Sequence, residues 1–217
     1  MYHLDYFKKI ISKKIGVELR DLSILNCGCG GGLEAQYFAE NGADVVGFDI
    51  SQLRSEASAT RFNYNKLDGL FYRGDASKLP FADRSFDVVL YHDSLHHVPI
   101  EEIPLAIREA SRVAIKAVVL LEAHDSPVRQ LLESMGLSTS IESAGNYVFR
   151  FKKNLMSYWA TQNSMELVNY TVLFTKKEHR PMIYAIPIFG FLFYYFIRSI
   201  GLLLNPMGNE ACIILKK

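Results

Sequence analysis

The first half of the chain alternates apolar runs with an amphipathic stretch. Residues 24–27 are a short, mostly apolar run, residues 33–41 carry apolar positions at helical spacing, and residues 44–48 form a second mostly apolar run. Glycines at positions 28 and 30–32 separate the first run from the helical stretch. This order of a strand, a glycine turn, a helix and a strand predicts one βαβ unit.

Helical and extended patterns continue to alternate after this unit. The run 117–121 is apolar without interruption, as expected for a central strand covered on both faces. Residues 3–15 place apolar positions at helical spacing opposite lysines, which predicts a helix that covers a sheet edge or the mouth of a site, or that touches anionic lipid. In chain order we expect further helices at 52–65, 101–112, 126–135 and 152–160, and further strands at 69–73, 88–91, 114–122, 167–175 and 208–215. Strands interleaved with helices in this way predict an α/β fold.

The glycine turn and the end of the second strand carry the first candidate chemistry. Glycine leaves no Cβ between the main chain and a ligand, and the N–H groups at the start of the following helix point at whatever is bound there. Asp49 lies roughly 20 residues beyond Gly28, at the end of the next strand, where a carboxylate can accept hydrogen bonds from both hydroxyls of a ribose. The unit therefore predicts a nucleoside-containing cofactor. Because Leu33 stands where the dinucleotide fingerprint needs its third glycine, the spacing is G-x-G-x-G rather than G-x-G-x-x-G.

Length and composition narrow the class of protein. At 217 residues, of which 49% are hydrophobic, the chain is long enough for one sizeable α/β domain and short for two, so we expect a single domain over residues 1–217. The formal net charge is +1 and the basic residues are spread along the chain. This distribution argues against nucleic acid as a partner and favours a small-molecule substrate.

The cysteines argue against a disulfide framework. The chain has 3 of them, Cys27, Cys29 and Cys212, which make an odd and widely split set. No second Cys or His pair stands at zinc spacing from the first two, so we expect no metal site. The N-terminal residues lack the apolar stretch of a cleaved signal peptide. We therefore expect a cytoplasmic protein, with membrane association left open by an apolar segment near the C-terminus.

Three motifs resemble those of the class I S-adenosylmethionine (SAM) dependent methyltransferases, in particular their small-molecule, type 11-like domains. Residues 25–32, Leu-Asn-Cys-Gly-Cys-Gly-Gly-Gly, are similar to the first motif of that family, with Asn26 in place of its acidic residue. A Gly-Asp pair at 74–75 ends the third strand. Phe-Asp-Val-Val at 86–89 and Leu-His-His-Val at 95–98 follow at the family's spacing and are the most specific match.

This resemblance implies a fold and a cofactor. The family's fold is a Rossmann-like, mostly parallel seven-stranded sheet in the order 3-2-1-4-5-7-6, with the last strand antiparallel and helices on both faces. The Asp after the third strand, here Asp75, commonly meets the exocyclic amine of adenine in this family. The implied cofactor is SAM, with a binding set of Asn26, Gly28, Cys29, Gly30, Gly32, Asp49, Ile50, Asp75, Ala76 and His92.

Histidines after the fourth strand are the candidate bases. Ligands of an open α/β sheet bind beyond the carboxyl ends of its strands, which would gather His92, His96 and His97 at one edge. Methyl transfer from a sulfonium needs mostly alignment, and a base is needed only if the acceptor must lose a proton. Histidine titrates near neutrality and suits a hydroxyl acceptor. His96 is the leading base, His92 is either a base or a structural residue, and His97 is interpreted mainly as a structural residue that holds its loop. Asp93 is a further candidate in the same segment, and Glu122 and His124 come next.

The sequence therefore predicts a SAM-dependent methyltransferase that acts on a small, apolar or amphiphilic acceptor, with O-methylation favoured. A short-chain NAD(P) dehydrogenase is excluded, because the chain lacks a Tyr-x-x-x-Lys spacing and the third glycine of the fingerprint. A noncatalytic SAM-binding or scaffold protein of the same fold is the alternative. Two features favour this alternative: Asn26 replaces the negatively charged residue of the first motif, and the chain carries a large apolar insertion.

The apolar insertion precedes the last strand. Residues 178–206 are interpreted as a helical insertion between the last two strands, and 181–197 contain no charged residue. Pro187 and Gly190 interrupt this run, which is shorter than the about 20 apolar residues that a membrane-spanning helix needs. Three interpretations stay open: a substrate lid or core packing, a homodimer contact, or docking at a membrane surface through 181–204.

Overall fold

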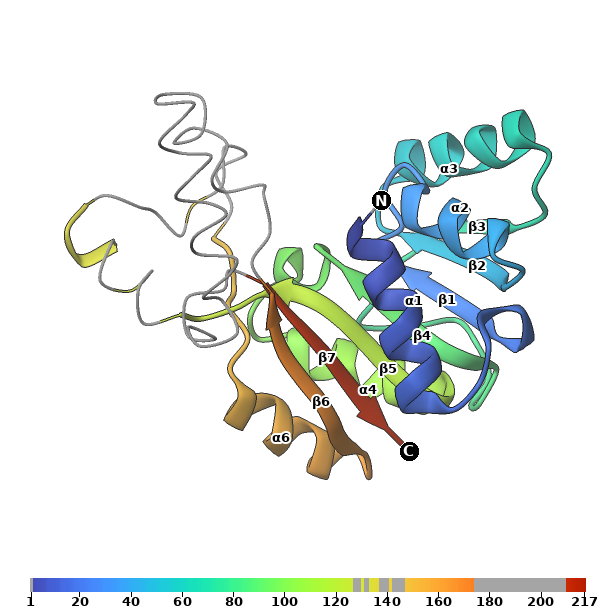
Figure 1. The fold of residues 1–217 in the computed structure, drawn as a ribbon. Coiled ribbons are helices and arrows are strands. Elements are labelled where there is room, and N and C mark those ends of the chain that lie inside the picture. Colours follow the sequence, from blue (N-terminus) through green and yellow to red (C-terminus); the bar gives the residue numbers. More distant parts are fainter. Residues whose placement is uncertain (1, 127–129, 131–132, 137–140, 142–146, 174–209) are drawn as a thin grey trace, which may run out of the picture.

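One mixed sheet forms the centre of the molecule (Figure 1). The computed structural model describes residues 2–126, 130, 133–136, 141, 147–173 and 210–217. The strands are β1 (Ser23–Cys27), β2 (Asp44–Asp49), β3 (Leu70–Arg73), β4 (Phe86–His92), β5 (Ala114–Ala123), β6 (Glu166–Leu173) and β7 (Glu210–Lys216). They pair in the order β3-β2-β1-β4-β5-β7-β6, with β1 to β5 parallel and β7 antiparallel to both of its neighbours. The predicted fold and strand order are confirmed.

Helices cover both faces of this sheet, as a parallel sheet buried on both sides requires. The side chains of β1 alternate between the two layers: Ile24 packs in the cluster that contains α1, α2 and α3, and Leu25 in the cluster that contains α4 and α6. The helices are α1 (Tyr2–Ile15), α2 (Leu33–Glu40), α3 (Gln52–Asn65), α4 (Ile103–Val113) and α6 (Lys153–Gln162), with one-turn 3₁₀ helices η1 (Leu19–Asp21) and η2 (Leu95–His97). Of the helix predicted at 126–135, residues 130, 133 and 134 are helical, 126 and 135 are not, and the others lie outside the described residues.

The N-terminal helix α1 lies across the sheet and reaches the end of β4. Phe7 and Ile11 are each 1% exposed and belong to the core beneath α1. Lys14 Nζ donates to the carbonyl oxygen of Val168 at 3.1 Å, so this lysine forms a hydrogen bond within the protein. The ring of Phe7 lies 6.0 Å from the ring of His92. The structure thus places this helix against the sheet, beside the end of β4.

The C-terminal strand closes the sheet after the predicted insertion. β6 and β7 precede and follow that stretch and pair antiparallel with each other. The insertion predicted at 178–206, with its apolar run 181–197, lies outside the described residues. No helix in the described part of the chain is long and apolar enough to cross a membrane.

Candidate active site

The glycine turn after β1 packs tightly between two neighbouring elements. Gly28 has a φ of +68° and Gly32 a φ of +76°, in the left-handed region that favours glycine. A Cβ added at Gly28 would lie 2.3 Å from Cβ of Ser94, and one at Gly32 would lie 3.0 Å from Oγ of Ser58. Both positions therefore need glycine for conformation and for space.

Asp49, the last residue of β2, ties this turn to the next helix. Its Oδ2 accepts a hydrogen bond from the N–H of Gly30 at 2.9 Å, and its Oδ1 accepts one from the N–H of Ser51 at 2.9 Å. Each carboxylate oxygen has a second lone pair. Asp49 can therefore hold the turn and still accept hydrogen bonds from a ligand.

A cavity of about 570 Å³ opens beyond the carboxyl ends of β1, β2 and β4. Small-molecule sites typically enclose about 300–1,000 Å³. The edge of the sheet at which it lies is the one where open α/β sheets bind ligands. The sequence-predicted residues that line the cavity are Gly28, Cys29, Gly30, Asp49, Ile50, Asp75, Ala76, His92 and His97.

Two predicted cofactor residues do not line the cavity. The side chain of Asn26 is 2% exposed, and its Nδ2 has no hydrogen-bond partner among the described residues. Side chains alternate along a strand, so Asn26 lies on the same face of β1 as Ile24. That face packs against the layer formed by α1, α2 and α3. Gly32 is the N-cap residue of α2 and packs against Ser58. The structure places neither residue in direct contact with the cavity.

A histidine and a carboxylate face each other on the cavity wall. His92 Nδ1 lies 2.9 Å from Oε1 of Glu34, and both residues line the cavity. If Nδ1 donates its proton to Glu34, the lone pair of the neutral ring is on Nε2. That Nε2 lies 3.9 Å from Oδ2 of Asp93. Our sequence analysis missed Glu34, although its place in the first turn after a glycine turn is a usable signal.

The two histidines of η2 are placed in the opposite way to our sequence-based interpretation. His96, the leading base in that interpretation, is 6% exposed and does not line the cavity, so we do not assign it as the base. His97, interpreted as the structural residue, is exposed and lines the cavity. A 3₁₀ helix has 3 residues per turn, so neighbouring side chains point to different sides.

Glu122 explains why His96 is buried. This carboxylate is 0% exposed, and its Oε2 lies 2.6 Å from Nδ1 of His96. Its Oε1 accepts hydrogen bonds from the N–H groups of Ser94 at 2.9 Å and Leu95 at 2.7 Å. Ser94 Oγ in turn donates to the carbonyl oxygen of Cys27 at 3.0 Å. Glu122 therefore fixes the segment after β4 against the glycine turn, which is a structural role and not that of a base.

The two thiols beside the glycine turn are unreactive because they are buried. Burial raises the pKa of Cys27 to about 12 and that of Cys29 to about 11. Both stay protonated at neutral pH, and the thiolate is the form that acts as a nucleophile or metal ligand. Within the described ranges, no group of three or more His, Cys, Asp or Glu side chains could hold a metal ion.

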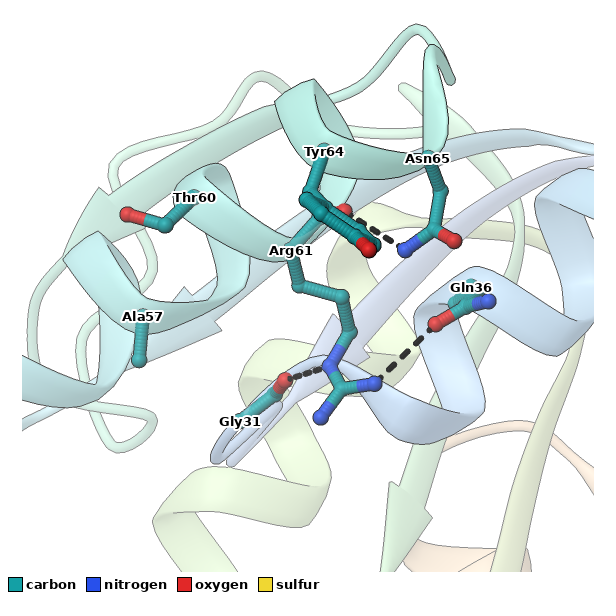
Figure 2. A pocket seen from close by; sticks show the side chains of 7 residues that line it. All are labelled: Gly31, Gln36, Ala57, Thr60, Arg61, Tyr64 and Asn65. Atoms are coloured by element: carbon teal, nitrogen blue, oxygen red, sulfur yellow. Dashed lines mark hydrogen bonds between the residues drawn. The ribbon is translucent and has the colours of Figure 1, made fainter.

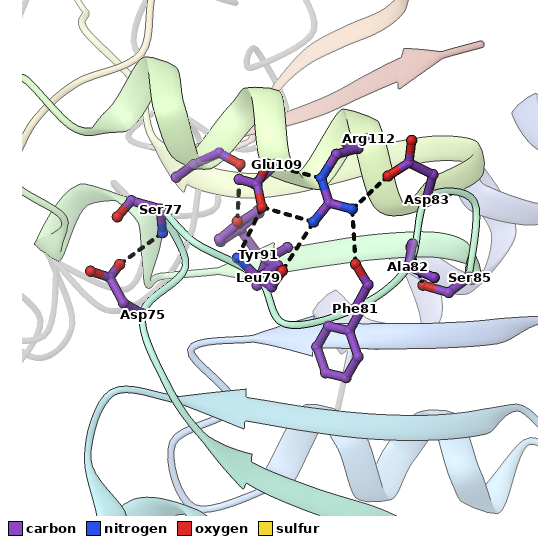
Figure 3. A network of polar contacts seen from close by, with 11 residues as sticks. Asp75, Ser77, Leu79, Phe81, Ala82, Asp83, Ser85, Tyr91, Glu109 and Arg112 are labelled. Carbon is purple, nitrogen blue, oxygen red and sulfur yellow. Dashed lines mark hydrogen bonds and ion pairs between the residues drawn. The ribbon is translucent and has the colours of Figure 1, made fainter.

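A polar network fixes the connection between Asp75 and β4 (Figure 3). Arg112, in the last turn of α4, donates from Nη2 to the carbonyl oxygen of Leu79 at 3.0 Å and from Nη1 to that of Phe81 at 2.8 Å. Its Nη2 also lies 2.9 Å from Oε2 of Glu109. The guanidinium lowers the pKa of the Glu109 carboxyl.

We expect Arg112→Ala to lower the free energy of unfolding by about 2 kcal/mol at neutral pH, because two carbonyls lose their donor and the carboxylates of Glu109 and Asp83 lose their charged partner. The folded-state pKa of Glu109 lies below its unfolded value, so its stabilisation is present above the unfolded pKa and is lost as the pH falls through the folded pKa. Urea unfolding at about pH 3 should therefore show a smaller deficit. Arg108→Ala, exposed on the same helix and only the smallest contributor to the lowered pKa of Glu109, is the control. Equal losses in the two variants would contradict the role of the network.

The sequence of residues 25–121 matches the family described as "Methyltransferase domain". This stretch is a methyltransferase domain. It runs from β1 through the glycine turn, Asp49 and the histidine segment to β5. The predicted family and its cofactor, SAM, are thereby confirmed.

Named relatives and a solved structure agree with this assignment. Methyltransferase GfsG of Streptomyces halstedii is 30% identical over 135 residues, which cover 57% of this chain and 49% of that protein. The ubiquinone biosynthesis O-methyltransferase of Pelagibacter ubique (strain HTCC1062) is 29% identical over 125 residues, which cover 55% of this chain and 51% of that protein. The chain thus spans about half the length of these curated relatives.

The methyltransferase domain also shares its fold with a crystal structure of magnesium protoporphyrin IX methyltransferase from Synechocystis PCC 6803 with bound S-adenosylhomocysteine (SAH). The TM-score is 0.70 at 17% identity, and the superposition covers 99% of this chain and 83% of that one. At this identity the likeness concerns the fold.

Proposed function

We propose that the chain is an enzyme that transfers a methyl group from SAM to a small, apolar or amphiphilic acceptor, most simply to a hydroxyl. The observation that supports this best is the composition of the cavity wall. It combines the glycine turn and the carboxylates of Asp49 and Asp75 with the pair formed by His92 and Glu34. A site suited to a nucleoside cofactor and a proton acceptor thus share one space.

The residues present fit SAM. Gly28 and Gly30 line the cavity with main-chain atoms that no side chain covers. Asp49 keeps lone pairs that can accept hydrogen bonds from ribose hydroxyls. Asp75 Oδ1 accepts from the N–H of Ser77 at 2.7 Å, as Figure 3 shows, and the carboxylate keeps lone pairs for an adenine amine. SAM, when bound, supplies an activated methyl carbon and a neutral leaving group. The chain then contributes alignment of the reacting atoms.

His92 is the residue that we propose as the base. A hydroxyl acceptor releases one proton when its oxygen gains the methyl group, and Nε2 of His92 takes that proton. The resulting imidazolium lies between the carboxylates of Glu34 at 2.9 Å and Asp93 at 3.9 Å. Nearby negative charge favours the protonated ring. Glu34 also sets which ring nitrogen carries the proton beforehand.

Apolar side chains at the cavity favour an apolar or amphiphilic acceptor. Leu33 and Ile50 are 59% and 70% exposed, and both line the cavity together with Val98 and Pro99. Exposed apolar side chains grouped around a cavity are typical of ligand contacts. The name of the relative from Pelagibacter ubique states O-methylation, which supports a hydroxyl as the acceptor group.

Two measurements test the proposal. Isothermal titration with SAM and SAH measures cofactor binding, and a screen with radiolabelled SAM against hydroxyl-bearing amphiphiles measures transfer. We expect both ligands to bind and label to appear in an acceptor. Binding without transfer to any acceptor would favour the noncatalytic SAM-binding or scaffold alternative. Absence of binding would overturn the proposal.

We expect His92→Gln to lower turnover of a hydroxyl acceptor about 100-fold, the lower range for loss of a general base. The dissociation constant of SAM should change far less, because the glycine turn and Asp49 stay intact. The loss should shrink for an acceptor whose hydroxyl is already ionised at the assay pH. His124→Gln is the control, since His124 does not line the cavity. Full turnover in His92→Gln would remove His92 as the base.

Other expectations from the sequence stay predictions. The single domain over 1–217 with an insertion at 178–206, the contact of 181–204 with a membrane surface or a second copy, and the cytoplasmic location are not tested by the described residues. The stretch 174–209 lies outside them.

A further inference from the structure

The helix α3 turns polar side chains toward the glycine turn. Its buried residues are Ser55, Ser58 and Phe62, and Ser58 is 0% exposed. The core-facing side of a helix is ordinarily apolar. Two buried serines, with Arg61 one turn after Ser58, therefore need a structural explanation.

Ser58 and Arg61 bind two consecutive carbonyl groups of the turn. Ser58 Oγ donates to the carbonyl oxygen of Gly30 at 2.8 Å, and Arg61 Nε donates to that of Gly31 at 2.6 Å. Arg61 Nη1 also donates to Oε1 of Gln36 on α2 at 3.1 Å. Figure 2 shows the Arg61 side chain extending from α3 to both of these acceptors.

These bonds set the orientation of two successive peptide groups. The C=O and N–H of a trans peptide point in opposite directions, and the described chain contains no cis peptide. With the carbonyl of Gly30 bonded to α3, the N–H of Gly31 is turned away from α3. With the carbonyl of Gly31 bonded to Arg61, the N–H of Gly32 is directed to the carbonyl oxygen of Cys29, to which it donates at 2.9 Å.

The start of α3 is tied to the same site. Ser51 is the N-cap residue of α3, and its N–H donates to Asp49, which also binds the N–H of Gly30. α3 is thus linked to the turn through Asp49 at its N-cap residue and through Ser58 and Arg61 in its middle. Movement of α3 would shift the turn and the carboxylate together.

We propose that Ser58 and Arg61 are positioning residues for the cofactor, which act through the glycine turn. The inference rests on the proposed SAM binding. Neither side chain lines the cavity. Arg61 instead borders a separate hollow of about 490 Å³ with Thr60 and Tyr64, shown in Figure 2, on the outer side of the turn. Their effect on affinity comes from preorganisation of the main chain, which spares the ordering cost on binding.

The test compares Ser58→Ala, Arg61→Ala and Arg61→Lys with Thr60→Ala. Thr60 is exposed, borders the same hollow and bonds within its own helix, so it is a matched control. Isothermal titration gives the dissociation constants of SAM and SAH. We expect both alanine variants to weaken binding about tenfold, by the same factor for SAM and SAH, because an effect that acts through the main chain of the turn is common to both ligands. Arg61→Lys keeps a donor for Gly31 and should lose less.

A second readout needs no ligand. Hydrogen exchange of the segment 28–34 should be faster in both alanine variants of the apo protein and unchanged in Thr60→Ala. Wild-type affinity in folded Ser58→Ala and Arg61→Ala, or equal weakening in Thr60→Ala, would overturn the inference. If Ser58→Ala does not fold, Arg61→Ala decides alone. A wild-type protein that binds neither SAM nor SAH would contradict the proposed function instead, and the exchange data would still report whether the two residues hold the turn.

Discussion

Gly28→Ala is expected to lower the free energy of unfolding by about 3–4 kcal/mol. A left-handed backbone costs a non-glycine residue about 1–2 kcal/mol, and overpacking a filled site costs about 1–3 kcal/mol. Both costs apply here, because φ is +68° and the added Cβ would lie 2.3 Å from Cβ of Ser94. Urea unfolding without ligand measures the effect. SAM affinity should fall as well, since either the turn or Ser94 must move.

Two neighbouring glycines separate the two costs. Gly30 has a φ of +53°, and a Cβ there would meet nothing within 4 Å. Gly30→Ala should therefore show the conformational cost alone, about 1–2 kcal/mol. Gly31 has an ordinary φ and equally open space. Gly31→Ala should stay within about 0.5 kcal/mol of the wild-type stability. Equal losses at the three positions would contradict the steric argument for Gly28.

The clash at Gly28 is severe because Ser94 is held from two sides. Its Oγ donates to the carbonyl oxygen of Cys27, and its N–H donates to Glu122. The glycine turn and the segment after β4 therefore form one packed unit, although they are far apart in sequence. A displacement of the glycine turn should therefore shift the segment after β4, and the reverse.

The parts of the site that the sequence predicted correctly are local. The order of strand, glycine turn, helix and strand depends on residues within one βαβ unit, and the position of Asp49 follows from the length of that unit. The strand order followed from the family resemblance and is confirmed. The βαβ unit and the place of Asp49 depend on the hydrophobic period and on glycine, which can both be recognised in a short stretch of sequence.

The parts that the sequence did not predict depend on contacts between distant segments. His96 and His97 are neighbours with the same chemistry, and the one that turns inward, His96, contacts the buried carboxylate of Glu122 on β5. Likewise, Ser58 and Arg61 on α3 carry no motif, and their role depends on the approach of α3 to the glycine turn. A one-turn helix and a helix–loop contact leave no periodic signal in the sequence.

Glu122→Ala is expected to destabilise the protein by about 3–5 kcal/mol, because each buried donor that is left without an acceptor costs about 1–3 kcal/mol. The substitution leaves the partly buried N–H of Ser94, the buried N–H of Leu95 and the ring of His96 without the carboxylate that they contact. Because this segment packs against Gly28 and carries His97 to the cavity, SAM binding should weaken in parallel. Urea unfolding and isothermal titration measure the two effects.

Glu122→Gln distinguishes hydrogen bonding from charge. The amide oxygen of glutamine can still accept from Ser94 and Leu95, and its NH₂ can donate to a neutral His96 ring. We expect a smaller loss than in Glu122→Ala, about 1–2 kcal/mol, because volume and hydrogen bonds are kept and the charge is removed. Glu101→Ala, at an exposed position, is the surface control and should behave as wild type. If Glu122→Ala were as stable as Glu101→Ala, the buried carboxylate would not hold the segment after β4, and the link from β5 through Ser94 to the glycine turn would have to be abandoned.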